Sequence, residues 1–146
     1  MSVEKYAFSS VPWVDYARSY VLDASEGQDL SGISMSFAEV FTDAPDALEP
    51  DDSGRVGWYI RVADGEIEVG SGVLEQADLS ITADYESTLP LARAVFAGDE
   101  AAQAEATATV EAMMADGRMV RTGDENAMAS LPWLADLHDT LAKRTL

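Results

Sequence analysis

Residues 58–69 read WYIRVADGEIEV, a pattern that predicts a β-hairpin. Large apolar residues occupy alternate positions up to Val62, and Ile67 and Val69 resume the alternation after Asp64-Gly65. An Asp-Gly pair between two alternating runs is a strong signal for a two-residue turn, because both turn positions need a positive φ. The alternation also predicts a sheet with one face on the core and one face in water, which is typical of antiparallel sheets covered on one side.

Further strands are expected on both sides of this hairpin. Residues 31–42 place Ile33, Met35 and Phe37 on one side of a strand, and residues 77–83 alternate in the same way. Residues 118–122 are expected to form a short last strand. Residues 43–54 are rich in acids and proline and indicate an exposed loop.

Helical spacing of apolar residues dominates the remainder of the chain. The predicted helices cover residues 11–24, a segment from 85 to 98 capped by Asp84, a segment from 100 to 115 capped by Asp99, and a last helix after Asp124 that is interrupted at Pro132. This order predicts an α+β fold, with a five-stranded, mostly antiparallel sheet and the helices packed on one face. We expect residues 1–146 to form a single domain, as is usual at this length.

Composition excludes several classes of function. The net charge of −18 argues against nucleic-acid binding, because phosphate backbones would repel the protein. There is no cysteine, and His138 is the only histidine, so disulfides, thiol catalysis and ordinary zinc sites are not expected. We expect no metal and no cofactor. No apolar run is long enough for stable membrane insertion, and the first residues lack a secretory h-region, so a cytoplasmic location is expected.

Four segments, in this order and spacing, resemble the sterol carrier protein 2 (SCP2) family of sterol-binding domains. They are the hairpin at 58–69, the strand ADLSITAD at 77–84, the helix end FAGD at 96–99, and DGRMVRTGD at 116–124. The resemblance covers about residues 30–145. It implies a hydrophobic tunnel between sheet and helices that takes up sterols, fatty acids, fatty acyl-CoA or similar lipid-like or polycyclic molecules. The segment at 99–116 differs from the family pattern in being long and alanine-rich.

Large apolar residues on the predicted inner faces are candidates for contact with such a ligand. For the methionines, ligand contact would mean a pliable pocket wall. The alternative for every candidate is ordinary core packing. The candidate ligand-binding residues are Phe37, Phe41, Trp58, Ile60, Phe96, Met113, Met114, Met119, Leu131, Trp133 and Leu134.

Two polar residues are candidates for chemistry in the same space. By strict alternation Glu39 shares a face with Phe37 and Phe41, where burial would raise its pKa, unless a β-bulge near Ala38 turns it outward. His138 lies near the inner stripe of the last helix, either as a hydrogen-bonded boundary residue or within reach of a substrate. Arg121 is expected to be solvated or paired with an acid, or to contact a carboxylate or phosphate.

Three functions are therefore considered. The first is non-catalytic binding of an apolar small molecule. The second is a small cofactor-independent enzyme of isomerase or hydratase type, with Glu39 and His138 as acid/base candidates. The third is an interaction subunit, which leaves a homo-oligomer or another protein as partner.

Overall fold

A computed structural model describes residues 4–146 and contains, within them, five strands and four α-helices. The elements in chain order are α1 (Val11–Ser25), β1 (Met35–Thr42), β2 (Val56–Ala63), β3 (Glu66–Ser71), β4 (Leu79–Asp84), α2 (Tyr85–Arg93), α3 (Glu100–Ala115), β5 (Met119–Gly123) and α4 (Leu137–Ala142). Short 3-10 helices span Asp46–Leu48, Ala127–Ser130 and Pro132–Leu134.

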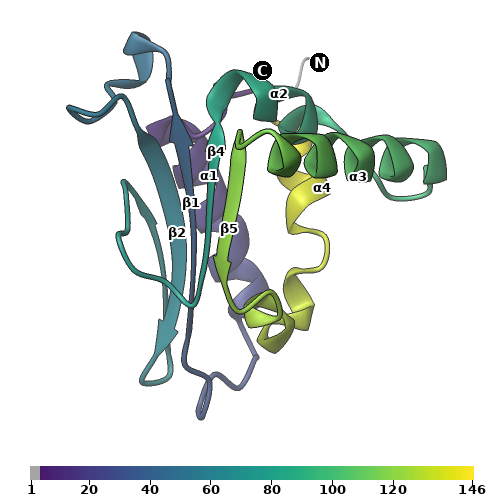
Figure 1. Cartoon of the computed structure of the whole chain (residues 1–146). Coiled ribbons are helices and arrows are strands. Elements are labelled where there is room, and N and C mark those ends of the chain that lie inside the picture. The colour runs from purple at the N-terminus through teal and green to yellow at the C-terminus, as the bar shows by residue number, and fades with distance from the viewer. Residues whose placement is uncertain (1–3) are drawn as a thin grey trace.

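The strands form one sheet in the order β3-β2-β1-β4-β5. Three neighbouring pairs are antiparallel, and β1 with β4 is parallel. The parallel pair arises because residues 72–78 return the chain from β3 past β2 and β1, so that β4 starts beside β1 in the same direction. The helices gather on one side of this sheet (Figure 1). The α+β class and the mostly antiparallel sheet are thus confirmed.

The hairpin and two helix starts form as their local chemistry predicts. Ala63 pairs with Glu66 across Asp64 and Gly65, whose φ values of 54° and 79° suit a type I′ turn. The side chain of Asp84 accepts a hydrogen bond from the backbone of Ser87 at 2.9 Å. Asp99 caps α3 in the same way, through the backbone N–H of Ala102 at 2.9 Å.

The core lies between the inner face of the sheet, α1 and the C-terminal segment. Phe8 packs on Phe41 with ring centroids 4.6 Å apart, and Trp13 packs edge-on against Trp58 at 5.3 Å. The indole Nε1 of Trp13 donates a buried hydrogen bond to Thr145 Oγ1 at 3.0 Å. This contact joins α1 to the C-terminal segment.

Two helices are shorter than their sequence patterns predict. The segment from residue 85 ends at Arg93, because Asp139 accepts hydrogen bonds from the backbones of Phe96 and Ala97 at 2.8 and 2.9 Å and holds them outside the helix. The predicted last helix is replaced by two 3-10 helices and the six-residue α4. Pro132 explains this break, since it cannot donate a backbone hydrogen bond.

The other boundaries move by small amounts. Strand β1 begins at Met35 rather than at residue 31, and β5 spans Met119–Gly123 rather than residues 118–122. None of the helices in the described part of the chain combines the length and hydropathy that crossing a bilayer requires.

The aromatic core predicts a large loss of stability on truncation of Phe41, which is fully buried. Phe41→Ala removes the ring beneath Phe8 and Tyr85 and should lower the free energy of unfolding by about 3–5 kcal/mol. Val120→Ala, at a side chain that is 54% exposed in β5, is the control and should change it by less than about 0.5 kcal/mol. Urea unfolding measures both; a Phe41→Ala loss as small as that of the control would contradict this core.

Candidate functional site

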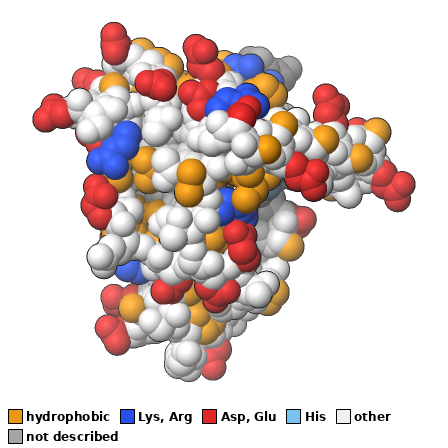
Figure 2. Space-filling view, viewed as in Figure 1, with side chains coloured by type: hydrophobic (Ala, Val, Ile, Leu, Met, Phe, Trp, Pro, Cys, Tyr) orange, Lys and Arg blue, Asp and Glu red, His pale blue; other side chains and the backbone are white. Residues whose placement is uncertain are grey.

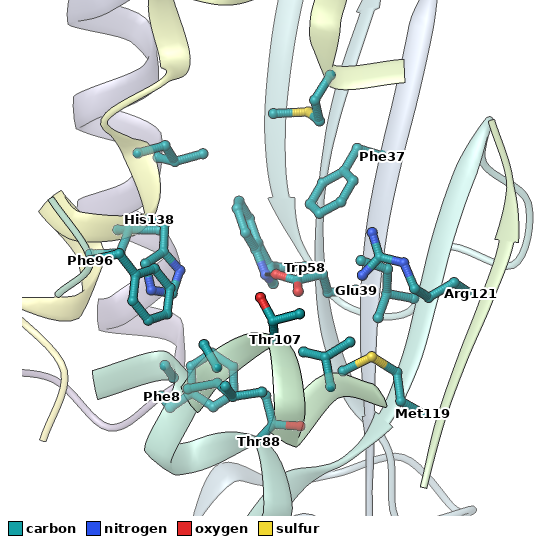
Figure 3. Close-up of a pocket in the computed structure, with 18 of the residues that line it drawn as sticks. Phe8, Phe37, Glu39, Trp58, Thr88, Phe96, Thr107, Met119, Arg121 and His138 are labelled. Atoms are coloured by element: carbon teal, nitrogen blue, oxygen red, sulfur yellow. Dashed lines mark hydrogen bonds between the residues drawn. The ribbon is translucent and has the colours of Figure 1, made fainter. Parts of the chain in front are cut away.

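A cavity of about 600 Å³ lies between the inner face of the sheet and its helical cover. Its floor includes Phe37, Trp58, Ile81 and Met119 from the strands, and Phe8 and Trp13 also line it. Figure 3 shows Phe8, Phe37, Trp58 and Met119 around this space. Further walls come from helices α2, α3 and α4, together with Phe96 and Met128. The volume falls within the range of roughly 300–1,000 Å³ typical of small-molecule sites.

One row of the sheet crosses this floor from β2 to β5. Glu39 in β1 lies directly opposite Trp58 in β2 and beside Ile81 in β4, and Ile81 in turn lies opposite Arg121 in β5. All four residues line the cavity. Because side chains on one row of paired strands share a face, the register brings two ionisable groups into an otherwise apolar floor.

The pairing of β1 with β2 has no bulge. Every residue from Met35 to Phe41 has a single partner, running without interruption from Val62 to Val56. The bulge that would have turned Glu39 outward is therefore absent, and its side chain points into the cavity (Figure 3).

The carboxylate of Glu39 is held in one orientation. The indole Nε1 of Trp58 donates a hydrogen bond to Glu39 Oε1 at 2.8 Å. Within residues 4–146 no group donates to Oε2, and this oxygen is not among the buried atoms without a partner, so it is open to the solvent of the cavity. Burial raises the pKa of Glu39, while the Trp58 hydrogen bond and the positive charge of Arg121 partly oppose that rise.

Arg121 is already paired on the other side. Its Nε and Nη2 donate to the carboxylate of Glu125, with the shortest contact at 2.8 Å. This contact lowers the pKa of Glu125, so the pair is ionised at neutral pH. The guanidinium charge near Glu39 is thus largely balanced by a carboxylate that lies outside the cavity wall.

Helix α3 forms the cover on the open side of the cavity. Five of its residues line the space, and their spacing of three and four places them on one helix face: Gln103, Ala106, Thr107, Val110 and Glu111. Met113 is the only buried residue of α3, which projects from the body of the molecule (Figure 1). Apolar side chains gather at its base (Figure 2).

The mouth of the cavity is marked by lining residues that are also exposed. Gln103, Thr107 and Glu111 lie on the α3 side, and His138 lies on the α4 side. The ring of His138 stacks on Phe96 at 4.5 Å, and its Nε2 is 2.9 Å from the carbonyl oxygen of Ala94. Because a carbonyl only accepts, this nitrogen carries the proton. His138 and Glu39 approach the cavity from opposite walls (Figure 3).

The described residues contain no group of three or more His, Asp or Glu side chains arranged to hold a metal ion. The ionisable groups of the cavity instead stand singly. The floor carries the carboxyl of Glu39 and the paired guanidinium of Arg121, and the mouth carries the carboxylate of Glu111 and the imidazole of His138.

Comparison with known proteins identifies the fold. No protein-family model matches the sequence, and no curated protein matches it significantly. Sterol carrier protein domain 2 of Helicoverpa armigera is similar in structure over 100% of this chain and 98% of its own, with a TM-score of 0.50 and 15% identity. The chain has an SCP2-like fold. Among other similar structures, a crystal structure of sterol carrier protein 2 has a TM-score of 0.47 at 16% identity, covering 93% of this chain and 95% of its own. The structure of palmitated SCP2L2 from Aedes aegypti has a TM-score of 0.41 at 14% identity, and the match covers 90% of this chain and 94% of its own.

Within this SCP2-like fold, the sequence candidates separate into three groups. Phe37, Trp58, Phe96 and Met119 line the cavity. Five others are buried in the core outside the cavity wall: Phe41, Ile60, Met113, Leu131 and Leu134. Trp133 packs partly buried against that core, and Met114 is 46% exposed.

Helix geometry and sheet rows explain these placements. Met113 and Met114 are neighbours, so they lie about 100° apart around α3 and only one of them can face inward. Phe41 and Ile60 share the inner face with Glu39, but they lie one row to either side of it and are covered by protein. We therefore omit these residues from the proposed ligand contacts.

Other lining residues were not among the sequence candidates. Thr88, Leu91 and Ala92 come from α2, and Phe8 precedes α1. Alternation along strands could not find them, because their position depends on how the helices dock. Helical spacing gave a usable signal for part of the wall, since the apolar stripes include Ala92 in α2 and Ala106 and Val110 in α3.

The buried carboxyl predicts a pH-dependent change in stability for Glu39→Gln. The folded state raises the pKa of Glu39, so the protonated form stabilises the fold at low pH and that contribution is lost as the pH rises through the folded-state pKa. Glutamine imitates the protonated form and can still accept from Trp58. We expect a higher Tm than wild type near pH 7, by roughly 3–4 °C for each kcal/mol recovered, and no difference below the ordinary value of 4.5.

Thermal unfolding followed by circular dichroism between about pH 4 and 8 measures this difference. Glu66→Gln is the matched control, because it removes the same charge from an exposed position in the hairpin. A difference between Glu39→Gln and wild type that matches the control at every pH would contradict the buried assignment.

Proposed function

We propose that this protein binds an apolar small molecule, lipid-like or polycyclic, in the cavity between sheet and helices. The observation that carries this proposal is the cavity of about 600 Å³, with aromatic and aliphatic side chains over most of its floor and an opening beside α3. Apolar clefts with a few fixed polar groups are the usual form of small-molecule sites. The SCP2-like fold agrees with such a role.

Burial of apolar surface would supply most of the affinity. Each 100 Å² of apolar ligand surface removed from water contributes about 2.5 kcal/mol, and association itself costs several kcal/mol, on the order of 4–15. The aromatic walls Phe37, Trp58 and Phe96 suit both an alkyl chain and a fused ring system. The apolar lining of the cavity therefore suits sterols, fatty alcohols and similar molecules.

The surface charge bears on the kind of ligand and partner. The net charge is −18, and acidic side chains outnumber basic ones on the face in Figure 2. A polyanionic ligand such as acyl-CoA, or an anionic membrane, would be repelled at long range. We therefore propose exchange of free, uncharged or cationic apolar molecules rather than docking on anionic lipid.

Exposed apolar side chains do not favour the interaction-subunit alternative. Among residues 4–146 the exposed large apolar side chains are spread over five segments: Val11 and Leu22 in α1, Val95 after α2, Met114 in α3, Val120 in β5 and Leu146. No single element presents them as one face.

Filling the cavity from its cover should abolish binding. Ala106→Trp places an indole on the cavity face of α3, and we expect it to weaken binding of the neutral apolar dye Nile red at least tenfold. Ala108→Trp is the matched control on the exposed face of the same helix and should change the affinity less than twofold. Fluorescence titration measures both, and circular dichroism checks the fold. Equal binding by wild type and Ala106→Trp, or no binding by wild type, would reject the cavity as the site.

The carboxyl of Glu39 supports a second candidate function, proton transfer on an apolar substrate. Burial raises the pKa of Glu39, which makes its carboxyl better suited to give and take a proton, as isomerisation or hydration of a double bond requires. With a polycyclic β,γ-unsaturated ketone as the probe, an enzyme would convert it, and Glu39→Gln would lose turnover at least a hundredfold while still binding Nile red. Absence of turnover in the wild type would leave binding as the function.

A further inference from the structure

Glu39 leaves one strong hydrogen-bond acceptor unused at the floor of the cavity. Trp58 fixes Oε1, so Oε2 keeps a defined position and faces the empty space. A ligand that covers this oxygen with a methylene group would remove its water without supplying a hydrogen bond, and such desolvation of a carboxylate costs free energy. A ligand that presents a donor would instead gain a charge-assisted hydrogen bond.

The charges around Glu39 favour a donor over an acid. Glu39 and Glu111 line the cavity, and Arg121 is the only guanidinium that does so among the described residues. Nε and Nη2 of Arg121 donate to Glu125, which lies outside the wall, so its charge is paired with that carboxylate, while Nη1 makes no hydrogen bond within residues 4–146. His138 stands at the mouth, where its Nε2 is bonded to the carbonyl oxygen of Ala94, and it does not belong to the floor. Glu125 and Glu39 lie near this guanidinium and Glu111 lines the same cavity, so a ligand carboxylate would be the fourth carboxylate beside a single guanidinium.

We propose that the cavity is selective for apolar molecules that end in one hydrogen-bond donor, a hydroxyl or a protonated amine bound by Glu39 Oε2, and that it discriminates against fatty carboxylates. This inference rests on the proposed binding function and specifies its ligand class. The apolar part of the ligand lies along the aromatic floor, and the donor group meets the row that contains Glu39 and Trp58.

Three probes with the same alkyl chain test the selectivity: dodecanol, dodecylamine and dodecanoate. Each competes with Nile red for the wild-type protein near pH 7.5, below micellar concentrations. We expect dodecanol and dodecylamine to displace the dye at concentrations at least tenfold lower than dodecanoate, because only they can donate to Oε2. The three chains bury the same apolar area, so the difference reports the terminal group.

Glu39→Gln should reverse this order. Its amide oxygen can still accept from Trp58, and its NH₂ then offers a donor to the cavity in place of an acceptor. We expect dodecylamine to weaken at least tenfold and dodecanoate to strengthen at least threefold. Glu105→Gln is the matched control, because it removes one charge from an exposed position of α3 outside the cavity, and it should change each probe less than threefold.

The outcomes separate the two proposals. If neither Nile red nor any dodecyl probe binds, or if Ala106→Trp leaves binding unchanged, the binding function itself fails. If the probes bind and Ala106→Trp blocks them, but the three bind within threefold of one another or dodecanoate binds best, the selectivity is overturned while the function stands. If Glu39→Gln leaves the order of affinities of the three probes unchanged, the role of Glu39 is likewise overturned.

Discussion

The one-to-one register between β1 and β2 sets the character of the cavity. Because no residue is inserted between Met35 and Phe41, Glu39 must share a face with Phe37 and Phe41 and lie opposite Trp58. A slip of one residue would exchange the two faces of β1 and place Ala38 and Val40 beneath the helices. The hydrogen bond between Trp58 Nε1 and Glu39 Oε1 exists only in this register, so the sheet pairing and the polar floor depend on each other.

The empty space depends on a different element, the helix α3. Its cavity face presents Ala106, Thr107 and Val110, which are too small to reach the floor, and its only buried residue is Met113 near its end. A helix with leucine or phenylalanine at these positions would fill the layer and remove the cavity. The alanine-rich composition of residues 100–115 therefore acts through volume: it provides a cover that encloses space without occupying it.

The parts of this structure that the sequence predicts are those with local causes. The turn at Asp64-Gly65, the caps at Asp84 and Asp99, and the inward position of Glu39 follow from turn chemistry, side-chain capping and alternation. The early end of α2 could not be predicted, because it depends on hydrogen bonds that the backbones of Phe96 and Ala97 donate to Asp139, more than 40 residues away along the chain. Whether Phe41 or Ile60 lies in the core or in the cavity wall depends likewise on how the helices dock on the sheet. Periodicity along a strand carries no information about that docking.

A fold that needed only stability would not keep a carboxyl at the position of Glu39. Burial raises its pKa, which means that the ionised form costs free energy in the folded state, and Trp58 and Arg121 offset only part of that cost. An apolar residue there would continue the floor formed by Phe37 and Ile81 with no such penalty. The structure instead orients the carboxylate through Trp58, leaves Oε2 free, and directs it into a space that is large enough for a guest. A carboxylate that is oriented by Trp58, costs stability and leaves one oxygen without a donor among residues 4–146 is explained by a donor that arrives with the ligand.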